Sequence, residues 1–401
     1  MPETMELLKQ LVNINSGSHN IDGVRKAGNL LQKEFEKIGF TTEWVYLPDS
    51  LKRAGHLVAS RKGTKGKKLL LIGHLDTVFE PDAPENPFTI LNDSTATGQG
   101  INDMKGGDVL ILAALQALHK TGLIKNATIT AYFTGDEEIA GEPASITRKD
   151  FIDRAKIHDI ALGFETAQGL HTVATGRRGA SSWQLKVFGK QGHSAGIFNN
   201  SYGAVYEAAR ILNTFRETLS KEKYLSFNPG FFVGGAEVAY DSINIRATVT
   251  GKNNIISPSA IVRGDLRFLT AAQHDSARAK MKRIVRFNNL AGTKAEISFI
   301  DGIPSMEPTD GNMKLVTILN GISEELGIGQ VKAGDPGSRG AGDISYVARY
   351  VDALDGLGVN GRGAHSPGET MDIRNFENLI QRAAIFIFRL TKNSHNISKD
   401  D

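Results

Sequence analysis

Apolar residues along the first part of the chain recur in two alternating patterns. Between residues 5 and 40 they return every three or four positions, which is typical of amphipathic helices. Short apolar runs then predict buried strands over 69–72, 128–133 and 160–164, with a helix over 109–118 between the first two. This order of strands and helices favours a mostly parallel, doubly wound α/β sheet with helices on both faces.

The pattern changes near the turn at 176–179. A half-exposed strand follows at 181–189, and the later periodicities predict helices over 202–215 and 271–287 and strands over 231–238, 243–250, 261–269 and 295–300. Such a series forms an antiparallel sheet with helices on one face, an α+β domain of the ferredoxin-like type. After Pro304 the first pattern resumes, with a helix over 313–326, a strand over 353–357 and a helix over 375–390.

The smaller domain is therefore inserted into the larger one. We expect residues 1–178 and 304–401 to form the two parts of the α/β domain, and residues 179–303 to form the inserted domain. A chain of 401 residues is too long for one ordinary core, which agrees with two domains. The polar tail at 393–401 is expected to fray.

Composition excludes several classes of site and partner. Lys and Arg number 47 against 44 Asp and Glu, and no basic tract of the nucleic-acid-binding kind is present. No apolar run reaches the roughly 18 residues of a membrane span. The chain has no cysteine, so any metal must be held by histidines and carboxylates. No signal peptide precedes residues 5–8, which favours the cytoplasm, or the periplasm or exterior if a signal has been removed.

Acids and histidines follow several predicted strands and glycine-rich turns of the larger domain. In "GHLDTV", His74 and Asp76 are two residues apart, so in an extended chain both face one side. The other positions are Asp103 in "GQGINDMKGGD", Asp136, Glu137 and Glu138 in "FTGDEEIAG", Glu165 in "LGFETAQ", and His365 in "GVNGRGAHSPGE". Taken singly, these residues are as readily a helix cap, solvated acids or an incidental loop histidine.

Together they fit a metal centre better than five separate surface features. The carboxyl ends of parallel strands lie at one edge of a sheet, where sites of α/β proteins are built. Two imidazoles and three carboxylates are more ligands than one tetrahedral site uses. They suit two ions that share a carboxylate, with zinc as the expected metal and cobalt or manganese as alternatives.

Six motifs in this order resemble the M20 family of metallopeptidases, in particular its glutamate carboxypeptidase branch. They are "GHLDTV", "GQGINDMKGG", "GDEEIAG", "GFETA", "GKQGHSAG" and "GAGDISYVA…GRGAHSPGE". The resemblance spans nearly the whole chain. It implies that His74 and Glu165 bind one metal ion, that His365 and Glu138 bind the other, and that Asp103 bridges both.

The same resemblance implies roles for residues that are not ligands. Glu137 would be the general base, and Asp76 would orient the ring of His74. His193 would polarise the substrate carbonyl in the neighbouring subunit of a homodimer built on the inserted domain. Asn254 and Arg267 would contact substrate, Arg267 through a two-pronged pair with a carboxylate. An incidental loop histidine and a surface charge are the alternatives for His193 and Arg267.

The expected activity is hydrolysis of an amide bond next to a free carboxylate by a di-zinc carboxypeptidase or dipeptidase. An N-acyl-amino-acid deacylase would use the same chemistry, so that alternative stays open. Two other classes, a metal-binding protein without catalysis and a nucleotide-binding enzyme, are disfavoured because the base and all five ligands are present and the glycines at 98–100 do not complete a dinucleotide fingerprint. Arg177, Arg178 and Arg339 add positive charge near the expected substrate space, and 197–199 lacks the proline common in the family, so the side-chain preference is left open.

Overall fold

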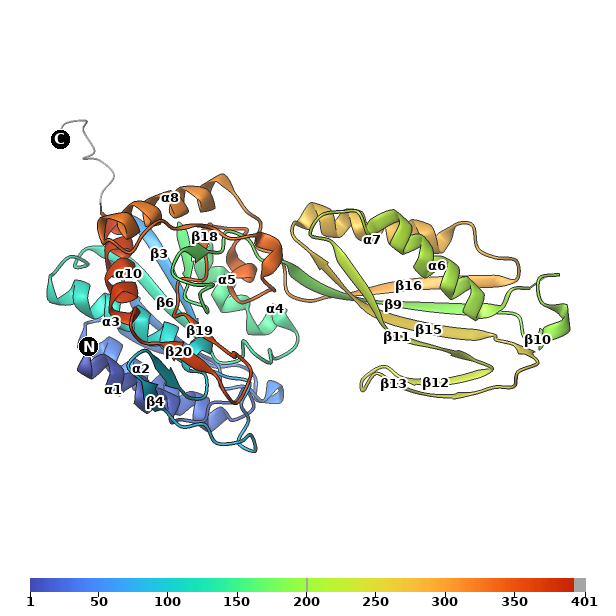
Figure 1. Ribbon diagram of the computed structural model, residues 1–401, viewed down its shortest axis with the longest axis horizontal. Helices are drawn as coiled ribbons and strands as arrows, with labels where there is room; N and C mark the ends of the chain where they lie inside the picture. Colours follow the sequence, from blue (N-terminus) through green and yellow to red (C-terminus); the bar gives the residue numbers. More distant parts are fainter. Residues whose placement is uncertain (200, 393–401) are drawn as a thin grey trace. The chain divides into compact units, whose positions relative to one another are not determined.

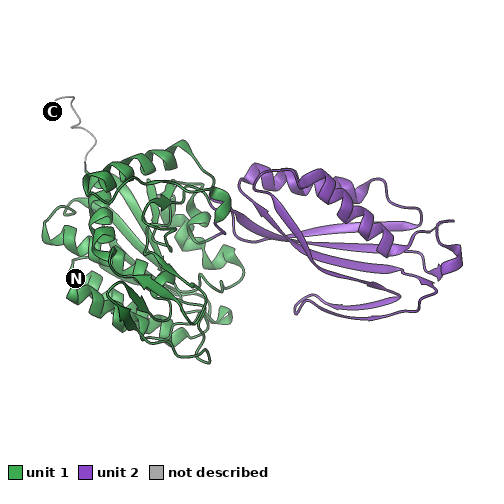
Figure 2. Cartoon of the chain, viewed as in Figure 1, with its two compact units in different colours: residues 1–176, 307–338, 342–401 green, residues 177–306, 339–341 purple. Residues whose placement is uncertain are grey.

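The computed structural model describes residues 1–199 and 201–392, and the predicted fraying of the tail at 393–401 lies outside the described residues. The chain folds into two compact units (Figures 1 and 2). Unit 1 comprises residues 1–176, 307–338 and 342–401, and unit 2 comprises residues 177–306 and 339–341. The expected insertion at 179–303 corresponds to unit 2 within three residues at each end. The short return of 339–341 to unit 2 has no counterpart in the sequence patterns.

Unit 1 is built on a six-stranded sheet of order β1-β2-β6-β3-β7-β18. Its strands are β1 (Thr41–Val45), β2 (His56–Arg61), β3 (Lys65–His74), β6 (Ala127–Thr134), β7 (Ile160–Gly163) and β18 (Asp352–Leu354). The last four run parallel, and β1 and β2 join antiparallel at one edge. The mostly parallel α/β sheet is thus confirmed. The strand expected over 353–357 is shorter, because the chain turns at Gly356, where φ is +73°.

Helices cover both faces of this sheet, because its central strands are apolar on both sides. Leu69, Leu71 and Phe133 pack into the main core. The alternate residue Tyr132 stacks on Phe151 at 4.7 Å on the opposite face. The helices are α1 (Pro2–Val12), α2 (Ile21–Lys37), α3 (Gly106–Lys120), α4 (Ala144–Thr147), α5 (Lys149–Ala155), α8 (Asp310–Glu325), α9 (Ile344–Val347) and α10 (Phe376–Thr391).

Short elements complete unit 1. A second, four-stranded sheet contains β4 (Thr89–Asn92), β5 (Thr95–Thr97), β19 (Gly361–Arg362) and β20 (Thr370–Asp372), and β8 (Thr172–Val173) pairs with β17 (Lys332–Ala333). Single turns are η1 (Asp49–Leu51), η2 (Ile101–Lys105) and η4 (Pro336–Ser338). Among the described residues no helix is long and apolar enough to cross a membrane.

Unit 2 is an antiparallel sheet of order β11-β15-β9-β16. Its strands are β9 (Gly179–Gly189), β11 (Ser226–Gly235), β15 (Ser259–Phe268) and β16 (Thr293–Asp301). Helices α6 (Gly203–Leu219) and α7 (Ala271–Arg286) cover one face (Figure 1). Ala208, Ile211 and Phe215 recur along α6 at helical spacing and pack with Trp183 of β9 in one core, as the α+β prediction required.

One stretch of unit 2 differs from the predicted strands over 231–238 and 243–250. Strand β11 ends at Gly235, and β12 (Glu237–Asp241) then pairs with β13 (Arg246–Thr250) as a separate hairpin. The prediction of one strand over 231–238 was wrong. The apolar pattern continues across Gly234 and Gly235, but two glycines without side chains weaken a strand, and the strand ends there. Two short strands, β10 (Gly192–His193) and β14 (Ile255–Ile256), and the turn η3 (Ser194–Gly196) complete the unit.

Candidate metal centre

The carboxyl end of the six-stranded sheet gathers the expected ligands of unit 1. His74 is the last residue of β3, and Glu138 and Glu165 follow the two strands that flank it, β6 and β7. These three strands are parallel, so their ends meet at the same edge. Asp103 comes from η2 just before α3, and His365 from the loop between β19 and β20. The fold thus brings together five residues that are distant in the sequence: His74, Asp103, Glu138, Glu165 and His365.

Asp103 lies between the two histidines. Its Oδ1 is 3.2 Å from Nε2 of His74, and its Oδ2 is 3.3 Å from Nε2 of His365. Each imidazole therefore faces a different oxygen of one carboxylate. This is the arrangement that a carboxylate bridging two metal ions requires.

One further carboxylate accompanies each imidazole. Oε1 of Glu165 is 3.5 Å from Nε2 of His74, and Oε2 of Glu138 is 3.1 Å from Nε2 of His365. The pairing His74 with Glu165 and His365 with Glu138 is the one that the sequence resemblance implies.

The donors of this cluster fit divalent ions. Ligand atoms of His74, Asp103 and Glu138 lie within 4.8 Å of one another, as do those of His74, Glu137 and Glu165. Oε1 of Glu138 is buried and has no hydrogen-bond partner among the described residues. A buried carboxylate oxygen is costly unless something pairs with it. Imidazole nitrogens and carboxylate oxygens at this spacing suit zinc or a similar ion.

The local field strongly favours positive charge. Hydrogen bonds to Asp103 and Glu138 raise the pKa of His365 to about 10, against a smaller opposing effect of burial. Burial lowers the pKa of His74, but its contacts with Asp103 and Asp76 outweigh this and hold the pKa well above its usual value. The carboxylates of the site therefore stabilise positive charge at the imidazole nitrogens. Metal ions bound at the same place would be stabilised by the same negative charge.

Glu137 lies in the same cluster but in a different electrostatic state. Burial raises the pKa of its carboxyl well above the usual value, and repulsion from Glu165 adds to the rise. A carboxyl with a raised pKa holds a proton more readily than an ordinary glutamate does. Such a group suits proton transfer better than it suits a permanent ion pair.

Asp76 supports the loop that carries the two glutamates. Its Oδ1 accepts the backbone N–H of Glu137 at 2.9 Å, and its Oδ2 accepts that of Glu138 at 3.1 Å. Nδ1 of His74 lies 3.0 Å from the backbone oxygen of Asp76 and 3.5 Å from its Oδ1. The ring is thus held mainly through the Asp76 carbonyl, and the side chain mainly holds the glutamate loop.

Two acids near the centre have structural partners that the sequence did not indicate. Asp136, the first of the three adjacent acids, is fully buried and pairs with Arg148 at 2.6 Å. Glu369 accepts the backbone N–H groups of Gly100, Asn102 and Asp103 at 2.9, 2.7 and 2.8 Å. Glu369 stands inside the motif of His365, but an acid in a glycine-rich loop carries no sequence signal of this role.

The remaining candidate residues belong to unit 2. His193 is exposed in β10, and its Nδ1 accepts the backbone N–H of Ala195. The backbone oxygen of Asn254 accepts the N–H of Ser194, which places Asn254 beside the His193 motif. Arg267 is partly exposed and donates from Nε to Asp265 at 3.0 Å.

Arg177, one of the additional arginines, is bound within unit 2 itself. It is buried, and it donates from Nε to the carbonyl oxygen of Gly340 at 2.6 Å and from Nη2 to that of Ala341 at 3.2 Å. Its guanidinium therefore holds the backbone of residues 340 and 341.

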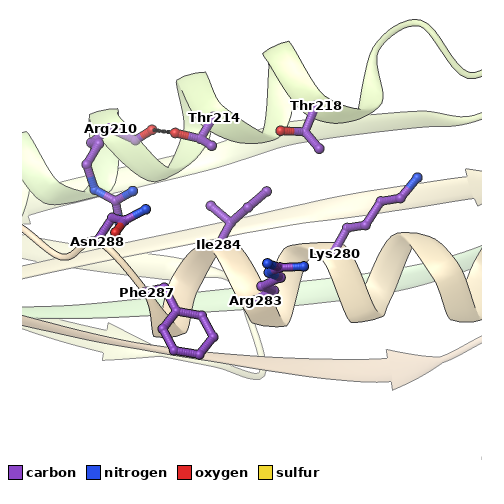
Figure 3. A pocket seen from close by; sticks show the side chains of 8 residues that line it. All are labelled: Arg210, Thr214, Thr218, Lys280, Arg283, Ile284, Phe287 and Asn288. Atoms are coloured by element: carbon purple, nitrogen blue, oxygen red, sulfur yellow. Dashed lines mark hydrogen bonds between the residues drawn. The ribbon is translucent and has the colours of Figure 1, made fainter.

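Unit 2 also has a groove between α6 and α7, a cavity of about 320 Å³ (Figure 3). Its basic side chains are Arg210, Lys280 and Arg283. Arg210 pairs with Glu207, and Lys280 pairs with Glu222. Because two of the three cations are already neutralised, the groove does not compete with the cluster of unit 1 as a catalytic site.

Comparison with known proteins agrees with this geometry. The chain is 29% identical to carboxypeptidase G2 of Pseudomonas sp. (strain RS-16) over 97% of this chain and 89% of that protein. It is 25% identical to succinyl-diaminopimelate desuccinylase of Coxiella burnetii over 94% of this chain and 97% of that protein.

Among solved structures, the aminopeptidase PepT of Bacillus cereus ATCC 10987 has the same fold. Its TM-score is 0.77 at 16% identity, with 97% of this chain and 98% of that chain covered. The model of peptidase family M20/M25/M40 matches residues 70–389, which include all five clustered ligands. This chain therefore belongs to peptidase family M20/M25/M40 and is a metal-dependent hydrolase.

Proposed function

We propose that this hydrolase holds two zinc ions and cleaves the amide bond next to a free carboxylate in a short peptide or an N-acyl amino acid. The observation that carries the proposal is the position of Asp103, whose two oxygens face the Nε2 atoms of two different histidines. His74 and Glu165 would hold one ion, and His365 and Glu138 the other. Cobalt and manganese suit the same donors.

The bound ions would polarise the substrate carbonyl and lower the pKa of a water molecule towards neutrality. Glu137 is the residue of this chain that moves the proton. It accepts a proton from the attacking water and delivers it to the nitrogen of the leaving amine, while a C–O bond forms and the C–N bond breaks. Its backbone N–H is held by the Asp76 carboxylate, which fixes the point from which its side chain would reach the water.

Recognition of the substrate carboxylate is assigned to Arg267, with Asn254 as a further contact. Arg267 is partly exposed on the sheet of unit 2, and Asp265 holds its Nε. A guanidinium that is held at one nitrogen is preorganised for a two-pronged pair. The similarity to a carboxypeptidase over nearly the whole chain supports this assignment.

Deacylation of an N-acyl amino acid is the second candidate function. It is favoured by the similarity to a desuccinylase over 94% of this chain. Both reactions break an amide bond with the same metal centre, and they differ only in the group on the far side of the bond. The metal centre alone therefore does not distinguish them.

We further propose that the working unit is a homodimer formed through unit 2. His193 belongs to unit 2, whereas Glu137 and the five ligands belong to unit 1. A two-fold dimer would supply each metal centre with the partner's histidine, and each partner would gain equally. No membrane or nucleic-acid partner is part of the proposal.

Metal content and hydrolysis together test the proposed function. Protein dialysed against trace zinc should hold about two ions per chain, and Asp103→Ala should hold fewer because it loses the shared ligand. Dipeptides and N-acyl amino acids, each with its C-terminal amide as a control, should then be screened with zinc, cobalt and manganese. Metal content near zero, or equal rates for acids and amides, would contradict the proposal.

A further inference from the structure

Arg148 is a buried cation to which the proposed chemistry assigns no role. It lies beside the loop that carries Glu137 and Glu138. It lies just before α5, and its side chain is 1% exposed. Nη1 donates to Oδ1 of Asp136 at 2.6 Å, and Nε donates to Oδ1 of Asp343 at 2.8 Å. Both acids are buried too. A single guanidinium thus joins two carboxylates that are 207 residues apart in the chain.

The network ties down the segment that carries Glu137 and Glu138. Nη2 of Arg148 also donates to the backbone oxygen of Asp136 at 3.0 Å, so both the side chain and the main chain before Glu137 are held. Oδ2 of Asp136 accepts the N–H of Gly141 at 2.8 Å. Thr134, the last residue of β6, donates to Asp343. Contacts of this network therefore lie just before the segment 135–141, near its start and at its last residue.

Folding stability alone is a weak reason for such a network. Taking three charges out of water is expensive, and well-packed apolar residues commonly stabilise a fold as well or better. What a forked guanidinium offers is geometry, because its donors have fixed directions and can meet two acceptors at once. A lysine in the same place would keep the charge and lose the second contact.

We propose that Arg148 is a positioning residue that holds the 135–141 segment, so that Glu137 reaches the water and Glu138 reaches its metal ion. The inference rests on the proposed function, because it takes Glu137 as the base and Glu138 as a ligand. The hydrogen bonds of Arg148 go to Asp136 and Asp343. It acts through Asp136, the residue directly before Glu137.

The test compares Arg148→Lys with Arg154→Lys. Arg154 is a matched control, because its Nε and Nη2 also join two carboxylates, those of Asp150 and Glu43 at 2.7 and 3.0 Å, but it does not touch the loop. In the zinc-loaded protein we expect kcat of Arg148→Lys to fall by at least about tenfold with KM changed less than about threefold, since small displacements of catalytic groups act on the transition state. Arg154→Lys should keep kcat within about twofold of wild type.

A readout besides activity separates positioning from general stability. Amide hydrogen exchange of the 135–141 segment should be at least about tenfold faster in Arg148→Lys, and unchanged in Arg154→Lys. If Arg148→Lys does not fold, Asp136→Asn takes its place, because it removes the same ion pair from the other side. Unchanged kcat and unchanged exchange in either folded variant would overturn the proposal. Wild-type protein that loads zinc but hydrolyses nothing would refute the proposed function, and the exchange result would still decide the role of Arg148.

Discussion

Oδ1 of Asp76 accepts the backbone N–H of Glu137 at 2.9 Å, and this bond joins the end of β3 to the loop after β6. Oδ2 of the same carboxylate accepts the N–H of Glu138 and the hydroxyl of Ser18 at 2.6 Å. Contacts with His74 outweigh burial and keep the pKa of Asp76 below its usual value, so the carboxylate stays ionised. The buried Asp76 carboxylate thus holds the backbone of both the proposed base Glu137 and the proposed ligand Glu138.

Asp76→Asn should therefore weaken both metal binding and turnover. An asparagine has one acceptor oxygen, so it leaves one of the two loop amides unpaired. We expect metal affinity to fall about 10- to 100-fold, the usual effect of losing a residue that orients ligands. Competition with a chelator measures this affinity. Ser18→Ala removes one contact of Asp76 and leaves both amide bonds, so its loss should be smaller; an equal loss would contradict this account.

Glu137→Gln separates metal binding from chemistry. Glutamine keeps the shape of the side chain but cannot accept the proton. We expect two bound metal ions and a kcat lowered by at least about 10²–10⁴-fold, the range typical of acid–base groups. Elemental analysis and single-turnover rates on one preparation measure both properties. Normal turnover with normal metal content would assign the base to another residue.

His56 makes the stability of unit 1 depend on pH. Its Nε2 lies 2.8 Å from the backbone oxygen of Thr147 and must donate to it, so Nδ1 accepts the N–H of Gly135 at 3.3 Å. Burial, together with the charge of Arg148, lowers the pKa of His56 to about 4. Between pH 6.5 and about 4, the His56 ring is therefore neutral in the folded protein, whereas the same ring is protonated in the unfolded chain.

Stability should consequently fall as pH decreases through that window. A shift from 6.5 to about 4 corresponds to about 3 kcal/mol in the free energy of unfolding, fully present above pH 6.5 and lost near pH 4. Denaturant unfolding of metal-free wild type and His56→Gln, measured from pH 4 to 8, isolates this contribution. The difference between the two should shrink as the pH falls; parallel curves would show that His56 does not titrate in this range.

Local pattern was enough to predict the parallel sheet and to mark candidate ligands near the ends of its strands, whereas the role of each ligand was implied by the family resemblance. The apolar run at 69–72 is followed by Gly73 and His74, the strand predicted over 128–133 is followed by the acidic loop that contains Glu138, and the strand predicted over 160–164 is followed directly by Glu165. Because these strands are parallel neighbours, their ends had to meet. The hairpin β12–β13 escaped prediction because apolar alternation continues through Gly234 and Gly235, so only pairing partners reveal the break.

Contacts between distant residues were not predictable in the same way. Arg148 and Asp343 lie 195 positions apart, and neither stands in a local pattern that marks it as buried. Glu369 faces three amides of a turn more than 260 residues earlier. Single buried charges resemble surface charges in a sequence, because their burial is decided by the tertiary fold that supplies their partners.

Arg267→Ala tests recognition of the substrate carboxylate. Loss of the guanidinium should raise KM for substrates with a free C-terminal carboxylate by about 10- to 100-fold, the worth of a charge-assisted pair. The corresponding amides should change much less. Arg263→Ala is the matched control, because Arg263 lies on the same strand and contacts Tyr240 and Ser242. Equal losses for acids and amides would mean that Arg267 serves packing.

The dimer prediction concerns His193, which belongs to unit 2 while the base Glu137 belongs to unit 1. If His193 acts in the partner's site, His193→Ala and Glu137→Gln should complement each other. A mixed dimer would have one site that lacks both groups and one site with both intact. Mixing the two inactive proteins under conditions of subunit exchange should restore activity to about a quarter of wild type, because half of the dimers are hybrids and each hybrid has one intact site. If His193 instead acts in its own chain, every site of the mixture lacks one group and no activity returns. A fully active monomer on size-exclusion chromatography would also contradict the dimer.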